Sequence, residues 1–111
     1  MEDFEFGCFH FFKLPNGDLE GGYTNNTLAV ILSEVAVAFD EINRGFTGTY
    51  NSTWIESNGN QASGVLTVRF IENTGNQKFR LEWVGRNNSG NFTGEGYIVD
   101  NMLIGNYTSS N

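Results

Sequence analysis

The sequence predicts a single β-rich domain over residues 1–111, in which an antiparallel meander curls into a small barrel or half-barrel. Apolar and polar residues alternate along several short segments, and clusters of Asn and Gly separate these segments. Alternation places one strand face in a core and the other in water, which is typical of antiparallel sheets. Regularly spaced turn signals favour a sandwich or a barrel. The class becomes α+β if residues 27–43 are helical.

The clearest strand is segment 78–83. Phe79, Leu81 and Trp83 share one face of it, and three charged residues occupy the other. Segment 65–71 alternates in the same way, and the polar loop 72–77 joins the two. Together they predict a hairpin at the centre of the meander.

The meander continues on both sides of this hairpin. Strands are predicted over 49–56, from Phe92, and over 97–99 and 102–104. Asp100-Asn101 joins the last two, and both residues tolerate the positive φ that a tight hairpin turn requires.

A short motif, apolar-x-Gly-(x)-x-Tyr, recurs at Leu19–Tyr23, Phe46–Tyr50, Phe92–Tyr97 and Leu103–Tyr107. Glycine weakens a strand, so its recurrence there marks bulges, sharp bends or close backbone approaches. Strongly coiled barrels need such positions.

An N-terminal hairpin is predicted ahead of the meander. Segment 4–14 is apolar near the centre of both faces, so we expect a strand that is covered on both sides. The turn 15–18 follows it, and segment 19–24 returns as the hairpin partner.

Residues 27–43 fit two patterns. At helical spacing Leu28, Ile31 and Val35 begin an apolar stripe, and Gly45 lies where a helix C′ residue would. As two short strands, the same segment alternates around a turn at Ser33 and Glu34. We favour the helix.

The amino-acid composition argues against several classes of function. A net charge of −7 and a pI near 4.4 disfavour nucleic acid and anionic membranes as partners. One Cys and one His exclude zinc sites built from several such residues, and no motif predicts a metal or cofactor. The acidic start Met-Glu-Asp does not resemble a signal peptide, so we expect a cytoplasmic protein.

The sequence resembles the small calycin barrels, which include lipocalin-like and avidin-like proteins. The resemblance lies in Phe46–Tyr50 with Trp54, in Trp83 and in Phe92–Tyr97. The resemblance implies a hydrophobic or aromatic small ligand in the barrel mouth. The candidate ligand-binding residues are Tyr50, Trp54, Phe79, Trp83 and Tyr97. The alternative is that these aromatic residues fill the core of a barrel without a cavity.

Segment 18–26, followed by a possible helix with Glu34, resembles the hot-dog thioesterases, although Tyr23 stands where that family has a histidine. This resemblance implies hydrolysis of an acyl-CoA by Asp18 or Glu34. A third hypothesis is a structural interaction protein, a possible homodimer, that pairs through an exposed apolar sheet face. Of the three, we favour a non-catalytic domain that binds a small ligand or a protein partner.

Overall fold

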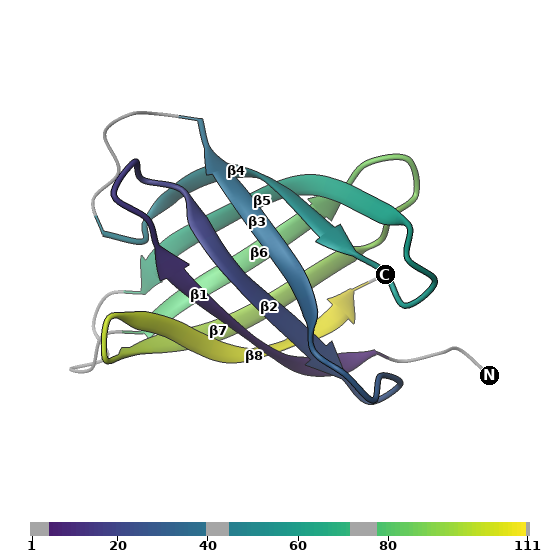
Figure 1. Cartoon of the computed structure of the whole chain (residues 1–111). Helices are drawn as coiled ribbons and strands as arrows, with labels where there is room; N and C mark the ends of the chain where they lie inside the picture. The colour runs from purple at the N-terminus through teal and green to yellow at the C-terminus, as the bar shows by residue number, and fades with distance from the viewer. Residues whose placement is uncertain (1–4, 40–44, 72–77, 111) are drawn as a thin grey trace.

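The computed structural model describes residues 5–39, 45–71 and 78–110. Eight antiparallel strands follow one another in sequence order and close into a barrel (Figure 1). The strands are β1 (Phe6–Lys13), β2 (Leu19–Asn25), β3 (Leu32–Ala38), β4 (Gly48–Ile55), β5 (Gln61–Ile71), β6 (Lys78–Gly85), β7 (Asn91–Val99) and β8 (Met102–Ser110). The predicted antiparallel meander and its closure into a barrel are therefore confirmed.

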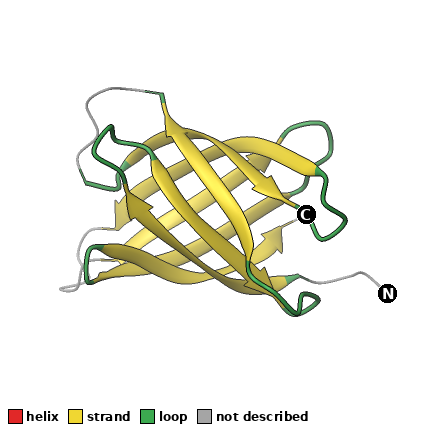
Figure 2. Cartoon of the chain, viewed as in Figure 1, coloured by secondary structure: helices red, strands yellow, loops and turns green. Residues whose placement is uncertain are grey.

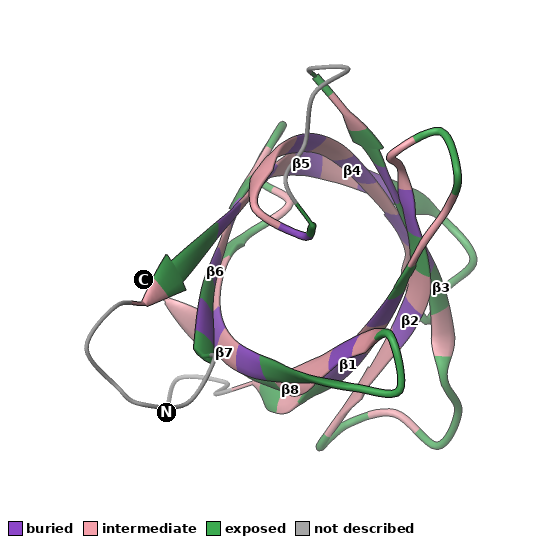
Figure 3. Ribbon diagram, turned by 90° about the vertical axis from the view of Figure 1, so that its left-hand side faces the viewer, coloured by how far each residue is buried: buried purple, intermediate pink, exposed green. Residues whose placement is uncertain are grey.

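Closure depends on the pairing of the first strand with the last. β1 pairs with β8 from Phe6 opposite Thr108 to Phe12 opposite Met102. Viewed along its axis, the chain forms a ring in which buried and exposed bands alternate along each strand (Figure 3). A closed ring has no free strand edge to pair with another chain.

The helix predicted over residues 27–43 is wrong. The described part of this segment is a loop followed by β3, and Figure 2 shows only strands and loops over the described residues. Ser33 and Glu34 lie within β3, so they do not form the turn of the alternative interpretation either. β3 forms backbone hydrogen bonds with β2 on one side and with β4 on the other. This long-range pairing overrides the helical spacing of the apolar residues in the segment. Residues 40–44 lie outside the described residues.

The hot-dog architecture, with a central helix wrapped by the sheet, is likewise not seen. No helix is present within 5–39, 45–71 or 78–110. None of these residues belongs to a helix that is long and apolar enough to cross a membrane.

The barrel interior is filled at one end. The side chains there are large, apolar and at most 1% exposed, and they come from five strands: Phe11, Leu19, Leu66, Val68, Leu81 and Leu103. Tyr50 is also fully buried, and its hydroxyl donates to the Phe46 carbonyl at 2.7 Å. This end, where β1 turns into β2 and β7 into β8, is a packed core.

Glycines on the inner face make room for aromatic rings. A Cβ on Gly96 would lie 3.2 Å from Cζ of Phe9, and one on Gly94 would lie 3.3 Å from Cζ3 of Trp83. Glycine at these two positions of β7 allows close approaches, as the repeated motif predicted.

The β7–β8 turn is also as predicted, because Asp100 and Asn101 both have positive φ, at 50° and 66°. The expectation that the first strand is covered on both sides near its centre is wrong. Phe9 and Phe11 are buried inside the barrel, whereas Cys8 on the outer face is exposed and Phe12, further along that face, is 48% exposed.

Candidate functional site

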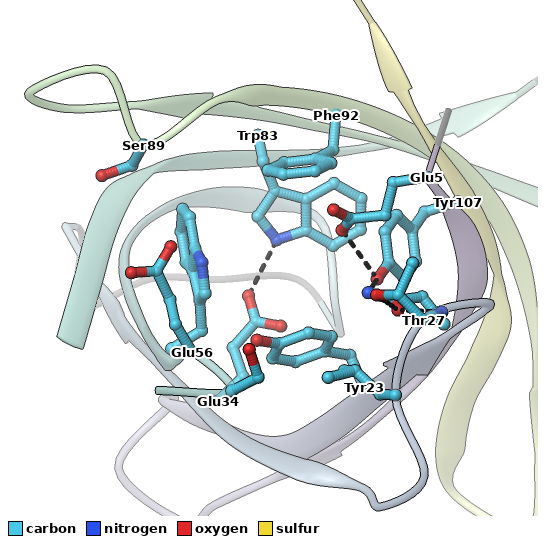
Figure 4. Close-up of a pocket in the computed structure, with 13 residues that line it drawn as sticks. Glu5, Tyr23, Thr27, Glu34, Glu56, Trp83, Ser89, Phe92 and Tyr107 are labelled. Atoms are coloured by element: carbon cyan, nitrogen blue, oxygen red, sulfur yellow. Dashed lines mark hydrogen bonds between the residues drawn. The ribbon is translucent and has the colours of Figure 1, made fainter. Parts of the chain in front are cut away.

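A cavity of about 170 Å³ lies at the opposite end of the barrel from the packed core (Figure 4). The loops after β2, β4 and β6 contribute to its wall. The described lining residues include five aromatic side chains and three glutamates, namely Tyr23, Trp54, Trp83, Phe92 and Tyr107, and Glu5, Glu34 and Glu56. No lysine, arginine or histidine is among the described residues that line it.

Glu34 is the buried polar group of this cavity. Its position in β3, opposite Trp54 of β4 and Gly21 of β2, directs the side chain into the barrel, where it is only 4% exposed. Its Oε2 accepts hydrogen bonds from Oγ of Ser52 at 2.7 Å and from Nε1 of Trp83 at 2.8 Å. No described residue donates a hydrogen bond to its other oxygen, Oε1.

Burial raises the pKa of the Glu34 carboxyl to about 7, although the hydrogen bonds from Ser52 and Trp83 act to lower it. Both protonation states are therefore populated near neutral pH. A buried carboxyl in a cavity with a pKa shifted this far is a recognised sign of a functional site.

The aromatic side chains form one continuous wall, with Tyr107 at its centre. The Tyr107 ring lies 6.3 Å from that of Tyr23, 6.0 Å from that of Trp83 and 5.8 Å from that of Phe92. The wall continues from Phe92 to Trp54, whose ring centroids are 6.2 Å apart with the planes at 88°. The Trp83–Tyr107 contact is tilted and the other three are edge-to-face, and such contacts fix the rings relative to one another.

A polar network closes one side of the mouth. The Tyr107 hydroxyl donates to Oε2 of Glu5 at 3.3 Å and accepts from Nδ2 of Asn25 at 3.0 Å. Oδ1 of Asn25 in turn accepts from the backbone NH of Thr27 at 2.9 Å. The start of β1, the end of β8 and the β2–β3 loop are thus tied together (Figure 4).

The electrostatic environment of the cavity is negative. Burial, followed by the charges of Glu34, Glu5 and Glu56, raises the pKa of the Tyr23 hydroxyl to about 12. Arg86, just after β6, is not among the lining residues, and its Nη2 donates to Oδ1 of Asn51 at 2.6 Å. The mouth therefore favours positive charge.

Two of the five candidate ligand-binding residues, Trp54 and Trp83, line this cavity. Tyr50 and Phe79 are buried inside the barrel but are not among its lining residues. Tyr97 is 56% exposed, and its position in β7 places it on the outer face. The structure brings together only the two tryptophans of the predicted set.

Asp18 and Glu34, the two carboxylates of the hot-dog hypothesis, lie apart. Asp18 is in the β1–β2 turn, where its Oδ1 accepts from the backbone NH of Ala38 at 2.9 Å and its Oδ2 from Nδ2 of Asn16 at 3.2 Å. It stabilises the turn at the filled end of the barrel, whereas Glu34 lies in the cavity.

Sequence reasoning missed Tyr23, Phe92 and Tyr107 as site residues. The repeated motif contained the signal for the two tyrosines. Gly21 and Gly105 precede Tyr23 and Tyr107 by two residues, so each glycine and its tyrosine share the inner face. In the Tyr97 copy the residue two positions earlier is Glu95 rather than an inner-face glycine, which places Tyr97 outside.

In the part of the chain that the structure describes, no three His, Cys, Asp or Glu side chains are grouped so that they could hold a metal ion. No protein-family model matches the chain, and no curated protein or solved structure was found to be similar to it.

Proposed function

We propose that the protein is a small-molecule-binding barrel that holds one ligand in the cavity at its open end. The observation that carries the proposal is Glu34, a buried carboxyl whose Oε1 has no donor among the described residues and which lies in an aromatic cavity. An unsatisfied buried acceptor costs folding free energy, so a site of this kind requires an explanation beyond stability.

The size of the cavity limits the ligand. Its volume of about 170 Å³ is close to that of an engineered cavity of about 150 Å³ that accommodates benzene. Pockets for drug-sized molecules are larger, roughly 300–1,000 Å³. The packed core also prevents a long chain from extending down the barrel. We therefore infer a ligand with one ring and a short substituent.

The geometry favours binding over catalysis. The described lining residues include neither His nor Cys, so they hold no Ser–His or Cys–His pair. Ser52, which hydrogen-bonds to Glu34, is 0% exposed and does not line the cavity. Its hydroxyl is therefore not accessible to a bound substrate.

The indole NH signals of Trp54 and Trp83 in ¹H–¹⁵N NMR spectra would test this proposal, with a panel of single-ring compounds that are cationic, neutral or anionic. We expect at least one compound to shift both signals saturably. Phe92→Leu in the cavity wall should weaken this binding, whereas Phe12→Leu on the outer face should not. No saturable shift from any compound in the panel would contradict the proposal.

A second candidate function is self-association through the outer face of β1, β7 and β8. Phe12, Met102 and Val99 form one row across these strands, and His10, Ile104 and Tyr97 form the next. Phe12 and Tyr97 are 48% and 56% exposed. By contrast, the outer face of β5 and β6 carries charges, such as the 2.8 Å ion pair between Arg69 and Glu82.

We propose a second copy of the chain as the occupant of this apolar face, because two acidic copies can meet there without opposing carboxylates at its centre. Sedimentation velocity should then show a dimer for the wild-type protein. Tyr97→Asp should give a monomer, while Thr67→Asp on the outer face of β5 should remain a dimer. A wild-type monomer at about 100 µM, a concentration at which weak dimers associate, would contradict self-association.

A further inference from the structure

We propose, building on the ligand-binding function above, that the ligand is a small organic cation, and that Glu34 is the group that binds its positive charge. A primary or quaternary ammonium attached by a short chain to one ring has the required chemistry. The cavity joins a buried carboxyl, a wall of aromatic rings and an excess of negative charge, and a cation satisfies all three features.

The first feature is the position of Glu34. Hydrogen bonds from Ser52 and Trp83 hold Oε2 in place, so the carboxyl group has a fixed orientation. In Figure 4 this carboxyl group lies between the Trp83 and Tyr23 side chains, inside the mouth. Oε1, which accepts no hydrogen bond from a described residue, is available to an ammonium NH.

The second feature is the uncompensated charge of the cavity. Glu5 and Glu56 lie on opposite sides of Glu34 in Figure 4, and no described lining residue is basic. The three carboxylates all act on the Tyr23 hydroxyl, which shows that their fields overlap inside the mouth. A bound cation would lower the electrostatic energy of this arrangement, whereas an anion would raise it.

The third feature is the aromatic wall. A cation near the face of a Trp, Tyr or Phe ring is attracted by the quadrupole of the ring, and this attraction increases when water is excluded. Five rings from β2, β4, β6, β7 and β8 line the cavity. The same rings would contact the apolar part of the ligand.

A neutral apolar ligand fits less well. It would bury Oε1 further without supplying a hydrogen-bond partner, so the carboxyl would be desolvated further. A neutral ligand with a hydroxyl could donate one hydrogen bond to Oε1 but would leave the negative charge in place. The expected order of affinity is therefore cation first, neutral donor second and anion last.

Three compounds of similar shape test this order: 2-phenylethylammonium, 2-phenylethanol and 3-phenylpropanoate. Calorimetric titration at pH 8, with the tryptophan NMR signals as a site-specific readout, should give the tightest binding for the ammonium compound. We expect 2-phenylethanol to bind on the order of tenfold more weakly or worse. We expect no measurable binding of 3-phenylpropanoate.

Glu34→Gln retains the size of the side chain and removes its charge. It should weaken binding of 2-phenylethylammonium by on the order of tenfold to a hundredfold and leave binding of 2-phenylethanol nearly unchanged. Glu20→Gln, on the exposed face of β2, should change neither affinity.

The outcomes separate the two proposals. Equal or tighter binding of the neutral or anionic compound would overturn the cation assignment and leave the ligand-binding function standing. Equal loss of affinity for 2-phenylethylammonium and 2-phenylethanol in Glu34→Gln would also overturn the assignment, because it would indicate a structural role for Glu34. Absence of binding by all three compounds and by the wider panel would overturn both proposals.

Discussion

Glu34→Gln should make the protein more stable at neutral and alkaline pH. The folded protein holds the Glu34 carboxyl at a pKa of about 7, against an ordinary value of 4.5 for a glutamate in water, because burial disfavours the charged form. The folded state therefore binds more protons than the unfolded state between these two values. Stability then falls as the pH rises through this window, and the loss is complete above about pH 7.

The size of this stability difference follows from the pKa shift of Glu34. About 2.5 units between 4.5 and about 7, at about 1.4 kcal/mol per unit, correspond to about 3 kcal/mol above pH 7. Glutamine has no charge to desolvate, and its side-chain oxygen can still accept the hydrogen bonds from Ser52 and Trp83. The variant should therefore match the wild type near pH 4 and exceed its free energy of unfolding by up to about 3 kcal/mol at pH 8.

Urea unfolding followed by tryptophan fluorescence, at intervals from pH 4 to pH 8, measures this difference directly. Subtracting the two curves removes the contributions of all other titrating groups, which the proteins share. Glu20→Gln serves as the control, because Glu20 is exposed in β2 and its variant should follow the wild-type curve. A difference between Glu34→Gln and the wild type that does not change with pH would refute the reasoning, as would a variant less stable at pH 8.

Three further outcomes are expected. Gly96→Ala should lower the free energy of unfolding by about 1–3 kcal/mol, because a Cβ there would meet the Ile104 carbonyl oxygen at 2.5 Å and the Phe9 ring; an unchanged urea midpoint would contradict the packing described. Asn101→Val should cost about 1–2 kcal/mol in the same assay, because a β-branched residue strongly disfavours the φ of 66° at this turn; a neutral result would mean that the turn has another conformation. The affinity for 2-phenylethylammonium, measured by calorimetry, should rise on the order of tenfold to a hundredfold from pH 5 to pH 8 as Glu34 ionises from a pKa of about 7. Tyr23, Glu5, Glu56 and Tyr107 also line this cavity, so Glu34→Gln must remove most of the rise if Glu34 is its source.

The sequence was most informative where the alternation of apolar and polar residues and the residues of the turns indicated the same structure. In segment 78–83, Phe79, Leu81 and Trp83 are buried as their spacing predicted, at 6%, 0% and 5% exposure. Asp100 and Asn101 have the backbone conformation that their turn required. Local conformational preference and long-range strand pairing favour the same structure at these positions, so a single sequence is sufficient to predict it.

The sequence failed in β3, whose inner face carries a carboxyl group between apolar residues. Its inner residues are Leu32, Glu34, Ala36 and Ala38, while Val35 and Val37 face outward and are 40% and 48% exposed. This reverses the polarity that normally identifies a buried strand face, and the spacing of the remaining apolar residues suggested a helix. The reversal marks the same residue that forms the candidate site, where local rules are expected to fail.

Burial of Glu34 could not be derived from composition, because it depends on the register of β3 between β2 and β4. The sequence named Glu34 only through a resemblance to hot-dog thioesterases, whose central helix the described residues do not contain. The aromatic wall was also found only in part. Trp54 and Trp83 were named, whereas Tyr23 and Tyr107 could have been found from the two-residue spacing to an inner glycine.

The most direct test of the proposed cation site is a titration of the Glu34 side-chain carboxyl by ¹³C NMR, with and without saturating 2-phenylethylammonium. We expect a pKa of about 7 in the free protein and a lower pKa in the complex, because a bound cation stabilises the charged form. A pKa near 4.5, the ordinary value for a glutamate in water, would contradict the burial of this group in the free protein. A raised pKa that the ammonium compound leaves unchanged would contradict the role of Glu34 as the counter-charge of the ligand.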